Sequence, residues 1–182
     1  ERLAEGLEVR SLANRDDSLH YALLTHLQDA GEETLPADKA LERAALRGID
    51  ELNRKYRSPE RFFLFHRPRR WNPGERRWMG YERKRGKLSQ LNAALRTNRF
   101  SPGFSLVVGE TAVLQTVKYV ITLDTDTQLP RDAARRLAGA MAHPLNKQYG
   151  ILQPRMAVSL PAASQSRYAQ LFGAEPGIDP YT

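Results

Sequence analysis

Cysteine is absent from the 182 residues of the chain, and histidine is scarce. Without cysteine the chain has no disulfide framework, no thiolate zinc site and no cysteine nucleophile. The histidines lie far apart in the sequence, at His20, His26, His66 and His143. Because they lack the short spacing of histidine-rich zinc sites, we expect any metal here to be a hard cation held by carboxylates.

Long apolar runs are absent as well. One of the longest, FFLF at residues 62–65, falls far short of the roughly 18 residues that a membrane-spanning helix needs. The N-terminus does not have the pattern of a signal peptide. At 182 residues the chain is long enough for one domain with a substantial core.

Positive charge is concentrated in one part of the chain. The formal net charge is +7, and residues 61–87, which we call the basic segment, hold 10 basic and 2 acidic residues. The other residues hold 18 basic and 19 acidic ones and are nearly neutral. This concentration predicts a local site for an anion such as a phosphate, a nucleic acid or a lipid surface.

The hydrophobic pattern predicts strands that alternate with helices. Strands are expected at residues 7–12, 21–24, 62–65 and 119–123, with one or two more within 150–159. Helices are expected at residues 36–56, 87–95, 130–141 and 161–172. Between them, residues 67–85 are rich in proline and glycine and predict a long loop with at most short strands. We therefore predict an α/β domain with a mainly parallel sheet.

No internal repeat or linker divides the chain, so residues 1–182 are expected to form a single partial domain. The first residues have the pattern of a helix end. The last residues, GIDPYT, add no closing element. We therefore expect a piece of a longer protein that is truncated at both ends.

The strongest chemical signal is YVITLDTDTQLP, in which an apolar run leads directly into Asp124 and Asp126. Carboxylates at positions i and i+2 project to one side of an extended backbone. At the carboxyl end of a parallel strand they would face the crevice where α/β sheets bind ligands. There they can hold Mg²⁺ or Mn²⁺, which keeps coordination sites free for diphosphate oxygens. The alternative is an ordinary polar turn, with Asp132 complementing the positive end of the next helix.

A second constellation, KRGKLSQLN at residues 84–92, closes the basic segment and opens a predicted helix. Lys87 and the first backbone N–H groups of that helix can meet a phosphate or a nucleotide. The alternative is a solvated basic face whose leucines belong to the core.

Three stretches of the chain together carry a resemblance to a known family. They are FLFHRPRRWNPGERRWMGYERKRGKLSQLNAAL, YVITLDTDTQLPRDAARRLAGAMAHPLN, and YGILQPRMAVSLP with GIDPYT. From about Leu7 onward the chain resembles the glycosyltransferase domain of bacterial cyclic β-1,2-glucan synthases. The resemblance implies a GT-A-like, Rossmann-like sheet flanked by helices. It also implies a position at the cytoplasmic face of the bacterial inner membrane, within a larger membrane enzyme that builds β-1,2-glucan from UDP-glucose.

The resemblance also implies roles for individual residues. Asp124 and Asp126 resemble the D-x-D motif, with Asp126 the main metal ligand and Asp124 facing the sugar and ribose of the donor. Lys87, Leu91 and Asn92 resemble the K-x-x-x-L-N pattern that lines the donor pocket of processive glycosyltransferases.

Two positions depart from the pattern of related enzymes. Ser89 stands where the commoner pattern has glycine. His26 stands where a carboxylate near the uracil is common at the end of the second strand, which leaves Asp29 as the substitute.

The implied reaction is an inverting displacement at C1 of glucose by a 2-hydroxyl of the glucan acceptor, with UDP as the leaving group. The general base is expected downstream of the chain, so we assign no catalytic residue within it. We expect the isolated chain to be inactive, with the donor, the acceptor and the rest of its own enzyme as its partners.

A phosphatase of the haloacid dehalogenase type is one alternative, because it also ends a buried strand with D-x-D. It would use Asp124 as the nucleophile. That pattern requires Thr or Val two positions after the second aspartate, where this chain has Gln128. A non-catalytic scaffold is a further alternative, since a fold alone does not guarantee activity.

A nucleic-acid-binding module is another alternative and would use the basic segment. Its aromatic candidates for stacking on bases are Trp71, Trp78 and Tyr81. No recognisable nucleic-acid-binding motif surrounds them, so we expect no specific nucleic acid as a partner. We expect both tryptophans to be buried against the domain, where they would anchor the segment and deliver Arg83, Lys84 and Lys87 to the donor crevice.

Overall fold

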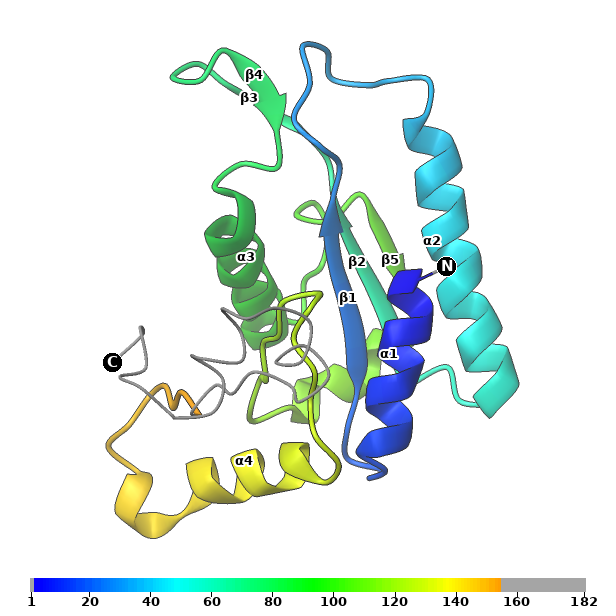
Figure 1. Ribbon diagram of the computed structural model, residues 1–182. Coiled ribbons are helices and arrows are strands. Elements are labelled where there is room, and N and C mark those ends of the chain that lie inside the picture. The colour runs from blue at the N-terminus through cyan, green and yellow to red at the C-terminus, as the bar shows by residue number, and fades with distance from the viewer. Residues whose placement is uncertain (1, 155–182) are drawn as a thin grey trace, which may run out of the picture. The chain divides into compact units, whose positions relative to one another are not determined.

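The structure, a computed structural model, describes residues 2–154 of the chain (Figure 1). The chain divides into two compact units that meet between Arg136 and Leu137. The elements of the first unit are α1 (Arg2–Ala13), β1 (Tyr21–His26), α2 (Asp38–Tyr56), β2 (Phe62–Arg67), β3 (Arg70–Asn72), β4 (Arg77–Met79), α3 (Arg83–Thr97), β5 (Leu106–Val108) and the 3₁₀ helix η1 (Thr111–Thr116). Helix α4 (Ala133–Ala142) crosses the division, and the short 3₁₀ helix η2 (Pro144–Asn146) belongs to the second unit.

The main sheet has the strand order β1-β2-β5. Strands β1 and β2 are parallel, with Tyr21 opposite Phe62 and His26 opposite Arg67. Strand β5 is antiparallel to β2 because the chain enters it beside the carboxyl end of β2, where Leu106 lies opposite His66. The α/β class is confirmed. The sheet is mixed and has three strands among the described residues, with β1 and β2 parallel and β5 antiparallel to β2, so the expectation of a mainly parallel sheet is not met. The GT-A-like architecture stays a prediction.

Strand β2 forms the centre of the core. Its residues Phe62, Phe63, Leu64 and Phe65 are all almost completely buried. Successive side chains of a strand point to opposite faces of the sheet, so a strand buried on both faces needs an unbroken apolar run. FFLF meets this need, and the strand predicted at residues 62–65 is confirmed.

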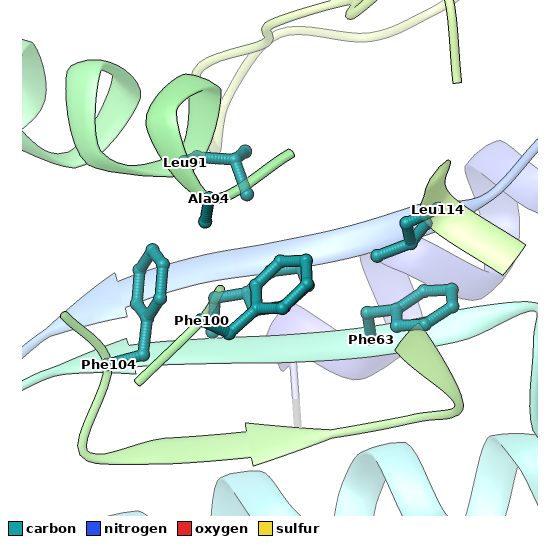
Figure 2. Close-up of a cluster of buried hydrophobic side chains, with 7 residues drawn as sticks. Phe63, Leu91, Ala94, Phe100, Phe104 and Leu114 are labelled. Atoms are coloured by element: carbon teal, nitrogen blue, oxygen red, sulfur yellow. The ribbon is translucent and has the colours of Figure 1, made fainter. Parts of the chain in front are cut away.

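One face of the sheet is covered by α3, η1 and the segment that follows α3. Phe63 and Phe65 point to this face and pack with Leu91, Ala94, Phe100, Phe104 and Leu114 (Figure 2). The ring of Phe65 stacks on that of Phe100 with centroids 5.1 Å apart.

The opposite face is covered by α1 and α2 (Figure 1). Phe62 and Leu64 point to this face and pack with Leu7 of α1 and with Ile49 and Leu52 of α2. The helix predicted at residues 36–56 is therefore confirmed by α2, whose spacing of apolar residues places its stripe on the sheet.

The strand predicted at residues 7–12 is wrong, because these residues belong to α1. Leu7 and Ser11, four positions apart, are buried on one side of the helix, whereas Val9 is 64% exposed. Burial at i and i+4 is the helical period. Alternation over six residues did not distinguish this helix from a strand.

The strand predicted at residues 119–123 is also wrong, since these residues form no strand in the structure. Tyr119 and Val120 are exposed, and Ile121 and Leu123 are only half-buried. A strand needs a neighbouring strand for its backbone hydrogen bonds, and among residues 2–154 the sheet does not include this segment. Side chains from α1 and α3 hold the end of the segment instead, as described below.

The remaining predictions divide by their place in the chain. The strand predicted at residues 21–24 is confirmed by β1, and the short strands allowed within residues 67–85 are β3 and β4. The helices predicted at residues 87–95 and 130–141 are confirmed by α3 and α4. Residues 150–154 form no strand. The rest of the 150–159 prediction and the helix at 161–172 lie outside the described residues. No helix within residues 2–154 is long and apolar enough to cross a membrane.

Candidate functional site

The candidate site lies at the carboxyl edge of the two parallel strands. His26 ends β1 and Arg67 ends β2, and the register places these two residues opposite each other. Helix α3 begins beside this edge, where Lys87 Nζ donates a hydrogen bond to the carbonyl of Leu24 at 3.3 Å. The carboxyl ends of parallel strands are where α/β sheets bind ligands, so the sheet brings Lys87 to the expected place.

Buried Arg67 fixes the start of α3. Its guanidinium donates to the carbonyls of Tyr81 at 3.1 Å and of Arg83 at 3.4 Å. The first turn of the helix is close-packed, because a Cβ on Gly86 would collide with the carbonyl oxygen of Tyr81. Glu82 and Arg83 both adopt positive φ angles, of 55° and 44°. Such angles are uncommon for residues other than glycine, and here they turn the chain sharply into α3.

Arg83 then connects α3 to the loop that follows β1. Its guanidinium forms an ion pair with Asp29 at 2.9 Å and a second with Glu75 of the β3–β4 turn at 3.1 Å. Asp29, the predicted donor-binding carboxylate, therefore lies beside the beginning of α3. A shallow pocket of about 290 Å³ opens next to it, between the hairpin and α3, lined by Asn72, Glu75, Met79, Tyr81, Glu82 and Arg83.

Lys84 connects α3 to the D-x-D segment. Its Nζ lies 2.6 Å from Oδ1 of Asp124. Asp124 and Asp126 are both exposed and lie in a turn, closed by a hydrogen bond from the N–H of Thr127 to the carbonyl of Asp124 at 3.1 Å. The expectation that a central strand presents these aspartates is wrong. Lys84 nevertheless joins Asp124 to the helix that also carries Lys87.

Asn92 is the predicted site residue that the structure does not bring to this group. It is exposed on α3, five residues after Lys87. At 3.6 residues per turn, five residues correspond to a rotation of about 140° around the helix axis. Asn92 and Lys87 therefore lie on different faces of α3, while the intervening Leu91 belongs to the core.

The electrostatic environment of the edge favours anions. The pKa of Lys87 is lowered, chiefly by burial and then by the positive charges of Arg67 and Lys84, while Asp124 raises it. The pKa of His26 is lowered by burial and then by Lys87 and Arg67. Positive charges that lie close together repel one another, and burial deprives some of them of water. A bound anion therefore stabilises such a group of cations strongly.

The donor set fits a hard cation in part. Asp124 and Asp126 offer carboxylate oxygens from one exposed turn, and such oxygens are the protein ligands that Mg²⁺ prefers. Within residues 2–154 no cluster of three or more His, Cys, Asp or Glu side chains could hold a metal. Mg²⁺ characteristically binds one or two carboxylates and fills its remaining positions with water and substrate phosphates. Asp124 and Asp126 supply this number of carboxylates.

The tryptophans differ from their prediction. Trp71 is 47% exposed and Trp78 is half-buried. They lie opposite each other in the β3–β4 hairpin, with ring centroids 5.9 Å apart. Directly opposed residues of a hairpin share one face, so the two rings pack on each other and leave Trp71 partly in solvent. The hairpin is anchored through the backbone instead, by two hydrogen bonds between Trp78 and Ala30.

Two contacts of the site have no counterpart in the predictions from sequence. Buried Arg69 pairs with buried Asp38 at the start of α2 and also donates to the carbonyls of Gln28 and Glu33. It thereby holds the loop that carries Asp29. Arg10 of α1 donates to backbone carbonyls of the D-x-D turn.

A comparison with protein-family models finds no match. A comparison with curated proteins finds 40% identity, over 196 aligned residues, to the cyclic β-(1,2)-glucan synthase NdvB of Rhizobium meliloti (strain 1021). The alignment takes in the whole chain and 7% of that much longer protein. The resemblance inferred from the sequence is thereby confirmed: the chain is related over its entire length to one segment of a cyclic β-1,2-glucan synthase.

Proposed function

We propose that the chain is the donor-binding part of a glycosyltransferase domain that transfers glucose from UDP-glucose to a growing β-1,2-glucan with inversion. The single observation that carries the proposal is the ion pair between Lys84 and Asp124 at 2.6 Å. It joins the D-x-D turn to the start of α3 at the carboxyl edge of the parallel strands. The relationship to a glucan synthase supports the same reaction class.

The charges at this edge suit a nucleoside diphosphate. Lys84 and Lys87 lie one turn apart on α3 and belong to the face that meets the carboxyl edge. A diphosphate would take the place of Asp124 as the anionic partner of Lys84 and would also meet Lys87. Cations positioned at a leaving diphosphate stabilise the charge that develops there during transfer.

In the proposal Asp126 and Asp124 hold Mg²⁺ or Mn²⁺. When bound, the cation neutralises negative charge on the diphosphate as UDP leaves. Asp29 contacts the base or ribose of the donor, since its partner Arg83 borders the pocket beside the hairpin. Asn92 lies on a different face of α3 from Lys87. It contacts the donor, in this proposal, only where the donor extends around the helix.

The acceptor and the general base belong, in this proposal, to other parts of the enzyme. The chain corresponds to 7% of its relative, and removal of a proton from the acceptor hydroxyl needs a positioned base. We therefore expect the chain alone not to elongate glucan. We also propose that this part of the whole enzyme lies at the cytoplasmic face of the bacterial inner membrane.

Isothermal titration of the 182-residue chain with UDP-glucose tests the proposal. We expect binding in the presence of Mg²⁺ or Mn²⁺, and loss of binding with a chelator or in Asp126→Asn. Asp17→Asn is the matched control, because Asp17 is an exposed aspartate near the opposite end of β1. Binding that persists in chelator and in Asp126→Asn would contradict the proposed role of the D-x-D turn.

A further inference from the structure

Helix α1 is attached to the D-x-D turn by one arginine. Arg10 Nη2 donates to the carbonyl of Thr127 at 2.6 Å and to the carbonyl of Thr125 at 3.1 Å. These two carbonyls lie immediately before and after Asp126 in the chain. One guanidinium therefore holds the backbone on both sides of the proposed metal ligand.

The guanidinium itself is held in place. Arg10 Nη1 donates to the carbonyl of Gly6, one turn earlier in α1, at 2.9 Å. This bond directs the side chain along its own helix before it reaches the turn. Arg10 is half-buried, and its hydrogen bonds to the carbonyls of Gly6 and Thr127 are partly buried, so these two bonds compete with less water than those of an exposed arginine.

The chain that leaves the turn is attached to the same end of α1. The N–H of Asp132 donates to the carbonyl of Ala13 at 3.1 Å, and the N–H of Ala134 donates to Oδ1 of Asn14 at 2.9 Å. The end of α1 thus serves as a platform for residues 125–134. Arg10 is the part of this platform that reaches Asp126.

We propose that Arg10 is a positioning residue for the D-x-D turn, which it holds in the shape that presents the Asp126 carboxylate to the donor complex. The turn needs such support because residues 119–123 do not join the sheet in the part of the chain that the structure describes. Arg10 is not assigned a catalytic role, because its hydrogen bonds go to backbone carbonyls. The inference rests on the proposed function of the turn and adds a residue that neither motif includes.

Amide hydrogen exchange on the full chain tests the positioning directly. In Arg10→Gln we expect the Thr127 amide, which closes the turn, to exchange about tenfold faster or more. The reason is that a hydrogen bond from a charged donor shifts the equilibrium between the open and the closed turn by about tenfold or more. Amides of β2 should keep their protection. Arg2→Gln is the matched control on the same helix and should leave the Thr127 amide unchanged. Arg10→Lys, which retains the charge, should restore part of the protection.

Two outcomes would overturn the inference. Unchanged exchange at Thr127 in Arg10→Gln would mean that the turn holds its shape without the arginine. Faster exchange throughout β2 as well would mean that Arg10 supports the whole fold and not the turn.

A second readout links Arg10 to the metal. In Arg10→Gln we expect the affinity for UDP with Mn²⁺ to fall about tenfold, matching the loss of turn protection. An unchanged affinity would contradict the inference. If the unsubstituted chain binds no UDP with Mn²⁺, the proposed function fails, and the exchange measurement alone decides whether Arg10 positions the turn.

Discussion

Arg69→Met is expected to destabilise the protein strongly, because it breaks a buried ion pair from one side. The Arg69 side chain is 2% exposed, and it pairs with the Asp38 carboxylate, with Nη2 3.1 Å from Oδ1. It also donates to the carbonyls of Gln28 and Glu33. Removing one partner of a buried pair leaves an uncompensated charge and costs about 3–5 kcal/mol.

Urea denaturation measures this cost. With a slope of about 2 kcal/mol/M, the expected loss lowers the unfolding midpoint by about 2 M. Arg70→Met is the matched control: Arg70, the next residue in the chain, is exposed at the start of β3, and its replacement should change stability by about 0.5 kcal/mol or less. Adding Asp38→Asn to Arg69→Met should recover part of the loss, since the stranded charge is then removed. Equal midpoints for Arg69→Met and Arg70→Met would refute the reasoning.

Two further predictions concern the pH dependence of stability and the binding of RNA. Burial lowers the pKa values of His26 and His66 in the folded protein below their ordinary 6.5, so the unfolded chain binds more protons and stability falls as pH decreases through about 6.5. Urea unfolding midpoints measured between about pH 7.5 and 5.5 check this prediction. The double variant His26→Gln/His66→Gln should show a weaker dependence of the midpoint on pH. A midpoint of the unsubstituted protein that stays constant over this range would contradict the prediction. For RNA, we expect only weak, salt-sensitive binding to the basic segment. Trp71 is 47% exposed, but its ring packs on that of Trp78, so we expect Trp71→Ala and Trp78→Ala to leave this binding unchanged. Tryptophan-dependent binding of a single strand at about 150 mM salt would favour the nucleic-acid alternative, since stacking on aromatic rings is the mode such strands use.

The elements predicted correctly are those whose local pattern has one structural meaning. The unbroken apolar run of β2 fits a strand buried on both faces, and the spacing of Ile49 and Leu52 fits a helix with one buried stripe. Both patterns can be seen without knowing the partner of the element. Local physics therefore determines the centre of the sheet and the helix that covers one of its faces.

The wrong predictions concern segments whose state depends on distant neighbours. Residues 7–12 alternate like a strand, yet Leu7 meets the core from a helix. Residues 119–123 have high β-propensity, but such propensity has effect only where a strand edge is offered. Strand β5, with three residues, is too short for its pattern to be distinguished from a loop.

The candidate site was predictable where residue chemistry is local. The basic segment and the D-x-D motif were identified separately from the sequence, and the structure connects them through Lys84 and Asp124. The contacts between Arg10 and the D-x-D turn span 115 and 117 residues of sequence, and the pair of Arg69 with Asp38 spans 31. No spacing rule relates residues so far apart, so these supporting arginines required the structure.

Paramagnetic broadening by Mn²⁺ with UDP, followed by NMR on the labelled chain, tests the central claim most directly because it locates the ligand. We expect broadening of the amides of residues 24–29, 83–87 and 124–127, which are connected by the contacts of Lys87 with Leu24, of Arg83 with Asp29 and of Lys84 with Asp124. Amides at the opposite end of the parallel strands, near Tyr21 and Phe62, should stay sharp. Broadening centred on that opposite end, or spectra unchanged by Mn²⁺ and UDP, would contradict a nucleotide-sugar site at the D-x-D turn.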